Sequence, residues 1–162
     1  MPSFNFRLSN NSGFTIVELL VVLAIIAILF TLSTINLGKS TNVASLSSAT
    51  STLLADIRNQ QIHAMTGDMG STSSQQPHGV YIQSNDYVLF ADSVYNSSDT
   101  YNYSVNTNDV SLSTTFPSNQ VVFSTGNGEV TGYTVGSNTI TLSENGSSKT
   151  ITINRFGATT VN

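Results

Sequence analysis

Hydrophobic side chains are concentrated in one N-terminal stretch of this chain and thinly spread elsewhere. From Phe14 to Leu32 the sequence is almost continuously apolar, and Glu18 is the only charged residue of the stretch. As an α-helix this stretch would be roughly 28 Å long, close to the ~30 Å thickness of the hydrocarbon core of a bilayer. The pattern therefore predicts a helix that spans a membrane, within a segment that we place at residues 14–38.

Two other interpretations of the apolar run are weaker. A secretory signal peptide would be cleaved after the run, but residues 33–38 offer a poor small-residue site, and the run is longer than the usual apolar core of about 7–15 residues. A buried central helix of a soluble protein would need an apolar covering, whereas the rest of the chain is rich in Ser, Thr, Asn and Gly.

A second helical pattern occupies residues 39–66. Its stripe recurs at helical spacing and is widened by flanking apolar residues, in all Val43, Leu46, Thr50, Leu53, Leu54, Ile57, Ile62 and Met65. This spacing predicts an amphipathic helix that continues the first one and lays its apolar side on a sheet. Gly67 or Gly70 is the expected terminator, and a polar loop follows.

Residues 67–162 have the alternation and turn residues of a β-rich domain. The first strands are predicted as a hairpin, with Val80 and Ile82 on one face and Val88 and Phe90 on the returning strand. An Asn/Ser/Tyr-rich stretch then reads as a long loop with edge strands.

Further strands follow, separated by glycines and by an expected turn at Asn145 and Gly146. The expected fold class is therefore α+β. A long N-terminal α-helix packs its C-terminal half on a small antiparallel β-sheet.

Composition narrows the choice of function. The 162 residues carry a formal net charge of -4, which gives no general attraction to a phosphate backbone. Cysteine is absent, so disulfide bonds and thiolate metal sites are excluded.

Glu18 needs an explanation, because a carboxylate deep in a bilayer costs at least ~2.5 kcal/mol. A cut between Gly13 and Phe14 would expose an α-amine on Phe14, about one helical turn from Glu18. In a stack of identical helices, the carboxylate of one copy could meet the amine of its neighbour, which neutralises two charges that are costly in an apolar environment. Glu18 would then act as a register device.

The stretch GFTIVELLVVLAIIAILFTL resembles the N-terminal segment of type IV pilins and type II secretion pseudopilins. The family pattern is a short polar leader ending in Gly, then Phe, Thr, two aliphatic residues, Glu and a long apolar run. The resemblance implies that residues 1–13 are a leader, which a prepilin peptidase removes by cutting after Gly13. It also implies that the peptidase methylates Phe14 and that Glu18 binds the N-terminus of a neighbouring subunit.

The same resemblance implies a location and partners. The protein would be a single-pass inner (cytoplasmic) membrane protein with its C-terminal domain outside the cytoplasm, and part of a surface filament after assembly. Its partners would be prepilin peptidase, other pilin or pseudopilin subunits, an inner-membrane assembly platform and, before assembly, membrane lipid. Many major pilins carry a proline near the end of the apolar run, where this chain has Ile35, so the sequence departs from an ordinary major pilin.

The order of the parts, with the segments VVFSTGNGEV and ITINRFGATTV, resembles minor pseudopilins and minor pilins of the GspH/FimT type. This resemblance implies a structural minor subunit of a type IV pilus or a type II secretion pseudopilus. The alternative is a minor pilin that acts as a DNA receptor or adhesin at a pilus tip. Nucleic-acid contact would then fall to Lys149 and Arg155, which are two cations in a net negative domain.

An enzyme is not expected. His63, in the predicted helix, and His78, in a predicted loop, form no recognisable catalytic pattern, and no phosphate-binding loop or H-E-x-x-H motif occurs. Four loop aspartates provide the oxygen ligands that calcium prefers, but not at EF-hand spacing: Asp86, Asp92, Asp99 and Asp109. We therefore expect no cofactor and no metal, and interpret these residues as solvated.

Overall fold

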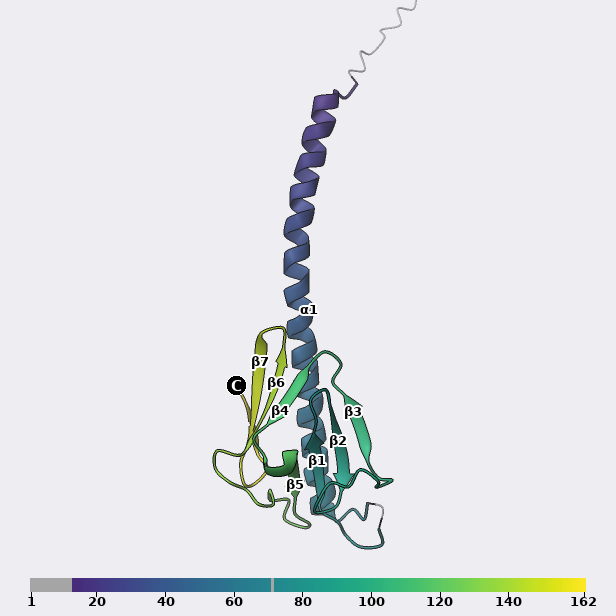
Figure 1. Ribbon diagram of the computed structural model, residues 1–162, viewed down its shortest axis with the longest axis vertical. Helices are drawn as coiled ribbons and strands as arrows, with labels where there is room; N and C mark the ends of the chain where they lie inside the picture. The colour runs from purple at the N-terminus through teal and green to yellow at the C-terminus, as the bar shows by residue number, and fades with distance from the viewer. Residues whose placement is uncertain (1–12, 71) are drawn as a thin grey trace, which may run out of the picture. The chain divides into compact units, whose positions relative to one another are not determined.

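The computed structural model describes residues 13–70 and 72–162, without the side chains of residues 32–43. The chain divides into two compact units, one up to Ser40 and one from Thr41 onward. A single helix, α1 (Ile16–Thr66), contributes to both units (Figure 1). It runs through Ile35 as helix, in agreement with the lack of proline between Phe14 and Pro77.

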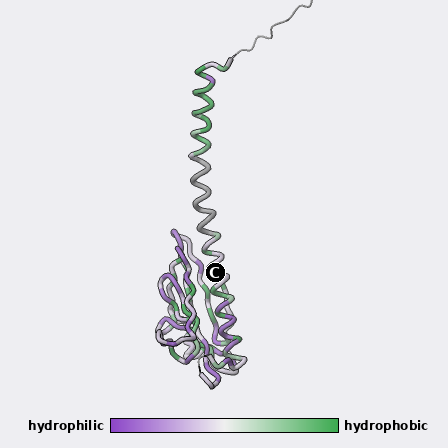
Figure 2. Tube along the Cα trace, turned by 90° about the vertical axis from the view of Figure 1, so that its right-hand side faces the viewer, coloured by the Kyte–Doolittle hydropathy of each residue, from purple (hydrophilic) through white to green (hydrophobic). Residues whose placement is uncertain are grey.

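The first turns of α1 consist mostly of apolar residues, which Figure 2 colours green, and their large side chains are exposed. Leu20 is 65% exposed and Phe30 is 72% exposed. Among the residues that the structure describes, no helical segment combines the length and the apolar character that crossing a bilayer requires. This finding covers only part of the predicted spanning segment, residues 14–38. The side chains of residues 32–38 are not among those that the structure describes.

Four members of the predicted stripe on the second half of α1 are buried: Leu46, Thr50, Leu53 and Ile57. Val43 lies outside the residues whose side chains are described. The predicted widening toward Ile62 and Met65 was wrong, since these side chains are 55% and 49% exposed. Gln60 and Ala64 are buried instead. With about 3.6 residues per turn, positions 60 and 64 lie on the same face of the helix as Leu53 and Ile57.

Gly67 ends α1, as the sequence predicts. Its φ of +76° is left-handed, which glycine adopts without a steric penalty. The next amide, of Asp68, donates to the carbonyl oxygen of His63 at 3.0 Å, and this bond closes the last turn in the manner of a Schellman motif.

The β-rich part contains two antiparallel sheets rather than the one small sheet expected (Figure 1). The first has the strand order β3-β2-β1-β5, and its strands are β1 (His78–Ile82), β2 (Asp86–Ala91), β3 (Tyr103–Asn106) and β5 (Gln120–Phe123). The second has the order β4-β6-β7-β8, and its strands are β4 (Ser111–Thr114), β6 (Thr139–Glu144), β7 (Ser147–Ile153) and β8 (Thr159–Val161). A short 3-10 helix, η1 (Pro117–Asn119), precedes β5.

The predicted hairpin is β1 and β2. Ile82 lies opposite Tyr87, so these two side chains share the face that enters the core. Val88 and Phe90 are buried on the other face, because side chains alternate along a strand. The predicted turn between β6 and β7 is also present, with left-handed backbone at both central residues, Asn145 (φ 46°) and Gly146 (φ 82°).

One hydrophobic core joins the second half of α1 to both sheets. Its fully buried side chains come from α1, from the first sheet and from the second sheet, and include Leu53, Ile57, Val80, Val121, Phe123, Ile140, Leu142, Ile151 and Ile153. This packing of a helix on antiparallel sheets confirms the α+β class.

Candidate processing and assembly site

The predicted cleavage junction lies in non-helical backbone. Gly13, Phe14 and Thr15 precede the first residue of α1. Phe14 is 81% exposed, and a side chain at Gly13 would meet no atom within 4 Å. Exposed backbone outside regular structure is the kind of backbone that proteases reach most readily. The peptide bond between Gly13 and Phe14 is therefore accessible in this structure.

Thr15 and Glu18 form a capping box at the start of α1. The amide and the hydroxyl of Thr15 both donate to Oε2 of Glu18, each at 3.2 Å, and the amide of Glu18 donates to the Thr15 hydroxyl at 3.2 Å. These bonds satisfy amide groups that the first turn of a helix otherwise leaves without an acceptor.

The capping box gives Glu18 a partner within its own chain. The capping box was not predicted from the sequence. A Thr followed three residues later by Glu, just before an apolar run, is nevertheless a known signal of a helix start. The bond that we predict between Glu18 and the terminal amine of a neighbouring copy remains a prediction.

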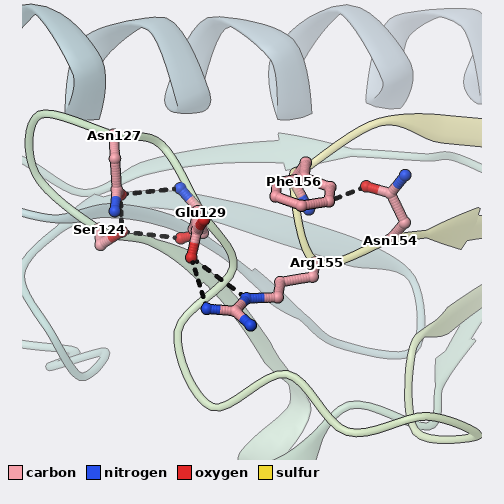
Figure 3. A network of polar contacts seen from close by, with 6 residues as sticks. All are labelled: Ser124, Asn127, Glu129, Asn154, Arg155 and Phe156. Carbon is pink, nitrogen blue, oxygen red and sulfur yellow. Dashed lines mark hydrogen bonds and ion pairs between the residues drawn. The ribbon is translucent and has the colours of Figure 1, made fainter.

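Lys149 and Arg155 are held at separate places in the head domain, residues 67–162. Lys149 lies on β7 and its Nζ donates to the hydroxyl of Ser47 on α1 at 3.0 Å. Arg155 lies beyond the other end of β7 and forms an ion pair with Glu129 at 3.2 Å (Figure 3). The structure therefore gives the two cations different partners, Ser47 and Glu129.

The two segments that carry the GspH/FimT resemblance lie against each other. The amide of Val130 donates to the carbonyl oxygen of Arg155 at 2.9 Å. Nε2 of Gln61, on α1, donates to the carbonyl oxygens of Gly128 at 3.0 Å and of Phe156 at 2.8 Å. The helix thus fastens both segments, and Figure 3 shows Glu129 and Arg155 reaching across the space between them.

The four loop aspartates do not converge. Within the described part of the chain, no three His, Cys, Asp or Glu side chains come close enough to hold a metal ion. Asp86 accepts a hydrogen bond from the hydroxyl of Ser104 at 3.1 Å, and Asp99 accepts one from the amide of Tyr101 at 2.8 Å. Asp99 therefore orders its own loop, whereas Asp86, the first residue of β2, is bonded across to β3.

A groove of about 390 Å³ lies between α1 and the ends of β2, β3 and β6. The hydroxyl of Tyr87 lines it and donates to Oδ2 of Asp56 at 2.6 Å. Burial and the nearby Asp56 carboxylate together raise the pKa of Tyr87 far above its usual range. Tyr87 therefore acts as a neutral hydrogen-bond donor that ties α1 to the first sheet.

The two histidines are neighbours. His63 is partly exposed near the end of α1, as its place in the helix predicts. His78 was predicted to lie in a loop, but it is the first residue of β1 and is completely buried. The pairing of His78 opposite both Ala91 and Phe123 places it between two strands, which explains the burial.

Comparison with known proteins places one motif on the chain. Residues 8–34 match the family model of the prokaryotic N-terminal methylation motif, which covers the cleavage junction, the capping box and most of the apolar run. No curated protein and no solved structure matches the chain.

Proposed function

We propose that this chain is a pilin or pseudopilin subunit, which a prepilin peptidase cuts between Gly13 and Phe14 and methylates on the new amine of Phe14. The observation that carries the proposal is the methylation motif at residues 8–34. The exposed, non-helical junction at Gly13 and Phe14 agrees with it, because a peptidase needs an extended substrate there.

The N-terminal half of α1 supports an architectural role in this proposal. Its large apolar side chains are exposed, and so much apolar surface on one helix needs a covering. Membrane lipid covers it before assembly, with the head domain outside the cytoplasm, and the helices of other subunits cover it afterwards. The inner-membrane assembly platform moves the subunit from the membrane into the filament.

Glu18 aligns the subunits in this proposal. Its carboxylate lies one turn from Phe14, so a neighbouring copy can bring its methylated amine to it at only one axial offset. A copy at another offset would leave both charges unpaired in an apolar surrounding, which is costly. Correct register is therefore favoured by electrostatics, while packing of the apolar side chains supplies most of the attraction.

A minor subunit of the GspH/FimT type is the finer form of the proposal. Two features support it. Ile35 stands where many major pilins have proline, and α1 continues through that position. The two segments of the GspH/FimT resemblance are joined to α1 through Gln61. The cations of the head domain, Lys149 and Arg155, both bond to groups of the same chain. A structural subunit that is one of several types in a filament fits such a head domain.

Mass spectrometry of the protein purified from its native cells tests the proposal. We expect a mature chain that lacks residues 1–13 and begins with N-methylated Phe14. The control is the same gene in cells without prepilin peptidase, where the full-length chain should accumulate. Native protein that retains Met1 in cells with an active peptidase would refute the proposal.

A further inference from the structure

Four side chains pack together where the C-terminal end of α1 meets the first residue of β1. The rings of His63 and His78 stack with their centroids 5.4 Å apart and their planes at 28°. The ring of Tyr101 meets the ring of His78 edge-on, with the centroids 5.5 Å apart and the planes at 72°. Asp68, just after α1, accepts from Nδ1 of His63 at 2.6 Å. We call His63, Asp68, His78 and Tyr101 the histidine latch.

The surroundings of the buried His78 ring suit its neutral form, which carries hydrogen on only one ring nitrogen. Its Nε2 lies 3.3 Å from the backbone carbonyl oxygen of Asp68, and because a carbonyl oxygen can only accept, Nε2 carries the hydrogen. Its Nδ1 is buried and has no hydrogen-bond partner among the described residues. A proton on Nδ1 would therefore place a charged donor in the interior without an acceptor, directly against the ring of His63.

We propose that the histidine latch is a pH-sensitive device, in which neutral His78 holds Asp68 and the last turn of α1 against β1 and protonated His78 releases them. The proposal concerns only residues of the second unit, from Thr41 onward, and does not depend on the proposed function.

The direction of the pH effect follows from the surroundings of His78. Burial lowers the pKa of His78, the hydrogen bond and charge of Asp68 oppose this in part, and the charge of His63 adds to the lowering. An unfolded or undocked His78 takes up a proton near its ordinary pKa of about 6.5. Between that pH and the lower pKa of the docked ring, the undocked state binds more protons, so docking is complete above about pH 6.5 and weakens as the pH falls.

Two further titratable groups near His78, Asp68 and Tyr101, do not change their charge in this pH range. The backbone hydrogen bond from Gly70 is the main cause that holds the pKa of Asp68 below its ordinary value, so Asp68 acts only at more acidic pH. Burial raises the pKa of Tyr101, which stays neutral through this range. The neighbours of His78 on the flanking strands are Ala91 and Phe123, which carry no charge.

An NMR titration of the full chain in detergent micelles tests the latch directly. At pH 7 the ring of His78 should show the neutral form with hydrogen on Nε2, and it should take up its second proton below pH 6.5. Two amides report on docking, that of Asp68, which donates to His63, and that of Gln76, which donates to Asp68. After correction for intrinsic exchange, their protection should fall as His78 becomes protonated, because the undocked state then binds the proton more tightly than the docked state.

Two variants separate the latch from general acid unfolding. His63→Gln removes the like charge beside His78, so the titration of His78 should move up toward pH 6.5. His78→Leu removes the titrating group, so the loss of protection that begins below about pH 6.5 should disappear. If His78→Leu does not fold, the wild-type titration decides. The proposal fails if His78 titrates at or above pH 6.5, or if protection at Asp68 and Gln76 is unchanged when His78 is protonated.

Discussion

Thr15 and Glu18 are bonded to each other in both directions across the first turn of α1, with all three hydrogen bonds at 3.2 Å. The proposed cut lies before Phe14, so Thr15 and Glu18 both stay in the mature chain. Glu18 therefore has a use in the lone subunit, as a helix cap, besides the proposed pairing with a neighbouring amine. The two uses can be separated by substitution.

Thr15→Val should fray the start of α1. Valine keeps the shape of threonine but cannot accept from the amide of Glu18, and loss of such a cap costs about 1 kcal/mol. We expect faster hydrogen exchange at the amides of Glu18 and Leu19, measured by NMR on the full chain in micelles. Thr15→Ser, which keeps the hydroxyl, is the control and should exchange at the wild-type rate. Equal exchange in the two variants would show that the capping box does not stabilise the helix start.

Glu18→Ala and Glu18→Val should leave membrane insertion intact and reduce incorporation into filaments, because the register-setting charge is lost. Glu18→Gln separates the two roles better, because glutamine can also occupy the N3 position of a capping box but carries no charge. We expect Glu18→Gln to protect the helix start and still fail to incorporate. The measurement is the fraction of subunit in sheared filaments relative to the membrane. Normal incorporation of Glu18→Gln would assign the role of Glu18 to capping alone.

Features set by neighbouring residues were predictable from the sequence. Gly67 was one of two glycines expected to end α1, with Gly70, because glycine accepts left-handed backbone. The hairpin of β1 and β2 follows from local alternation of side chains. The methylation motif is equally local and was recognised without any knowledge of the fold, whereas the roles given to Gly13, Phe14 and Glu18 within it remain predictions.

Features set by distant partners were not predictable. Two sheets form because β4 pairs with β6, whose register joins Leu112 to Leu142, and no local pattern encodes such a pairing. The burial of His78 depends on strands on both sides of it, and that of Gln60 depends on where the sheets meet α1. Arg155 was named only as a nucleic-acid contact of the alternative function, and its ion pair with Glu129 was not foreseen because Glu129 is remote in sequence.

Leu53→Ala should destabilise the head domain strongly. The side chain of Leu53 is 0% exposed and belongs to the core that joins α1 to both sheets, and removal of such a leucine leaves a cavity that costs about 2–5 kcal/mol. Thermal unfolding followed by near-UV circular dichroism of the tyrosines is the measurement. Ile62→Ala, at a position 55% exposed on the same helix, is the control and should change the midpoint little. A larger effect at Ile62 than at Leu53 would contradict the observed orientation of α1.

Gln61→Ala should loosen the two segments that α1 fastens. The variant loses the hydrogen bonds to the carbonyl oxygens of Gly128 and Phe156, and because the site is half-buried, water replaces them only in part, so the loss is about 1–2 kcal/mol. We expect a lower unfolding midpoint by tyrosine circular dichroism and faster exchange at the amide of Val130, which donates to Arg155 between the same segments. Asn59→Ala removes an exposed amide side chain from the same helix and is the matched control, which should not lower the midpoint. If Gln61→Ala unfolds at no lower a temperature than the control and the exchange at Val130 is unchanged, Gln61 does not fasten these segments, and the ion pair of Glu129 with Arg155 must hold them without it.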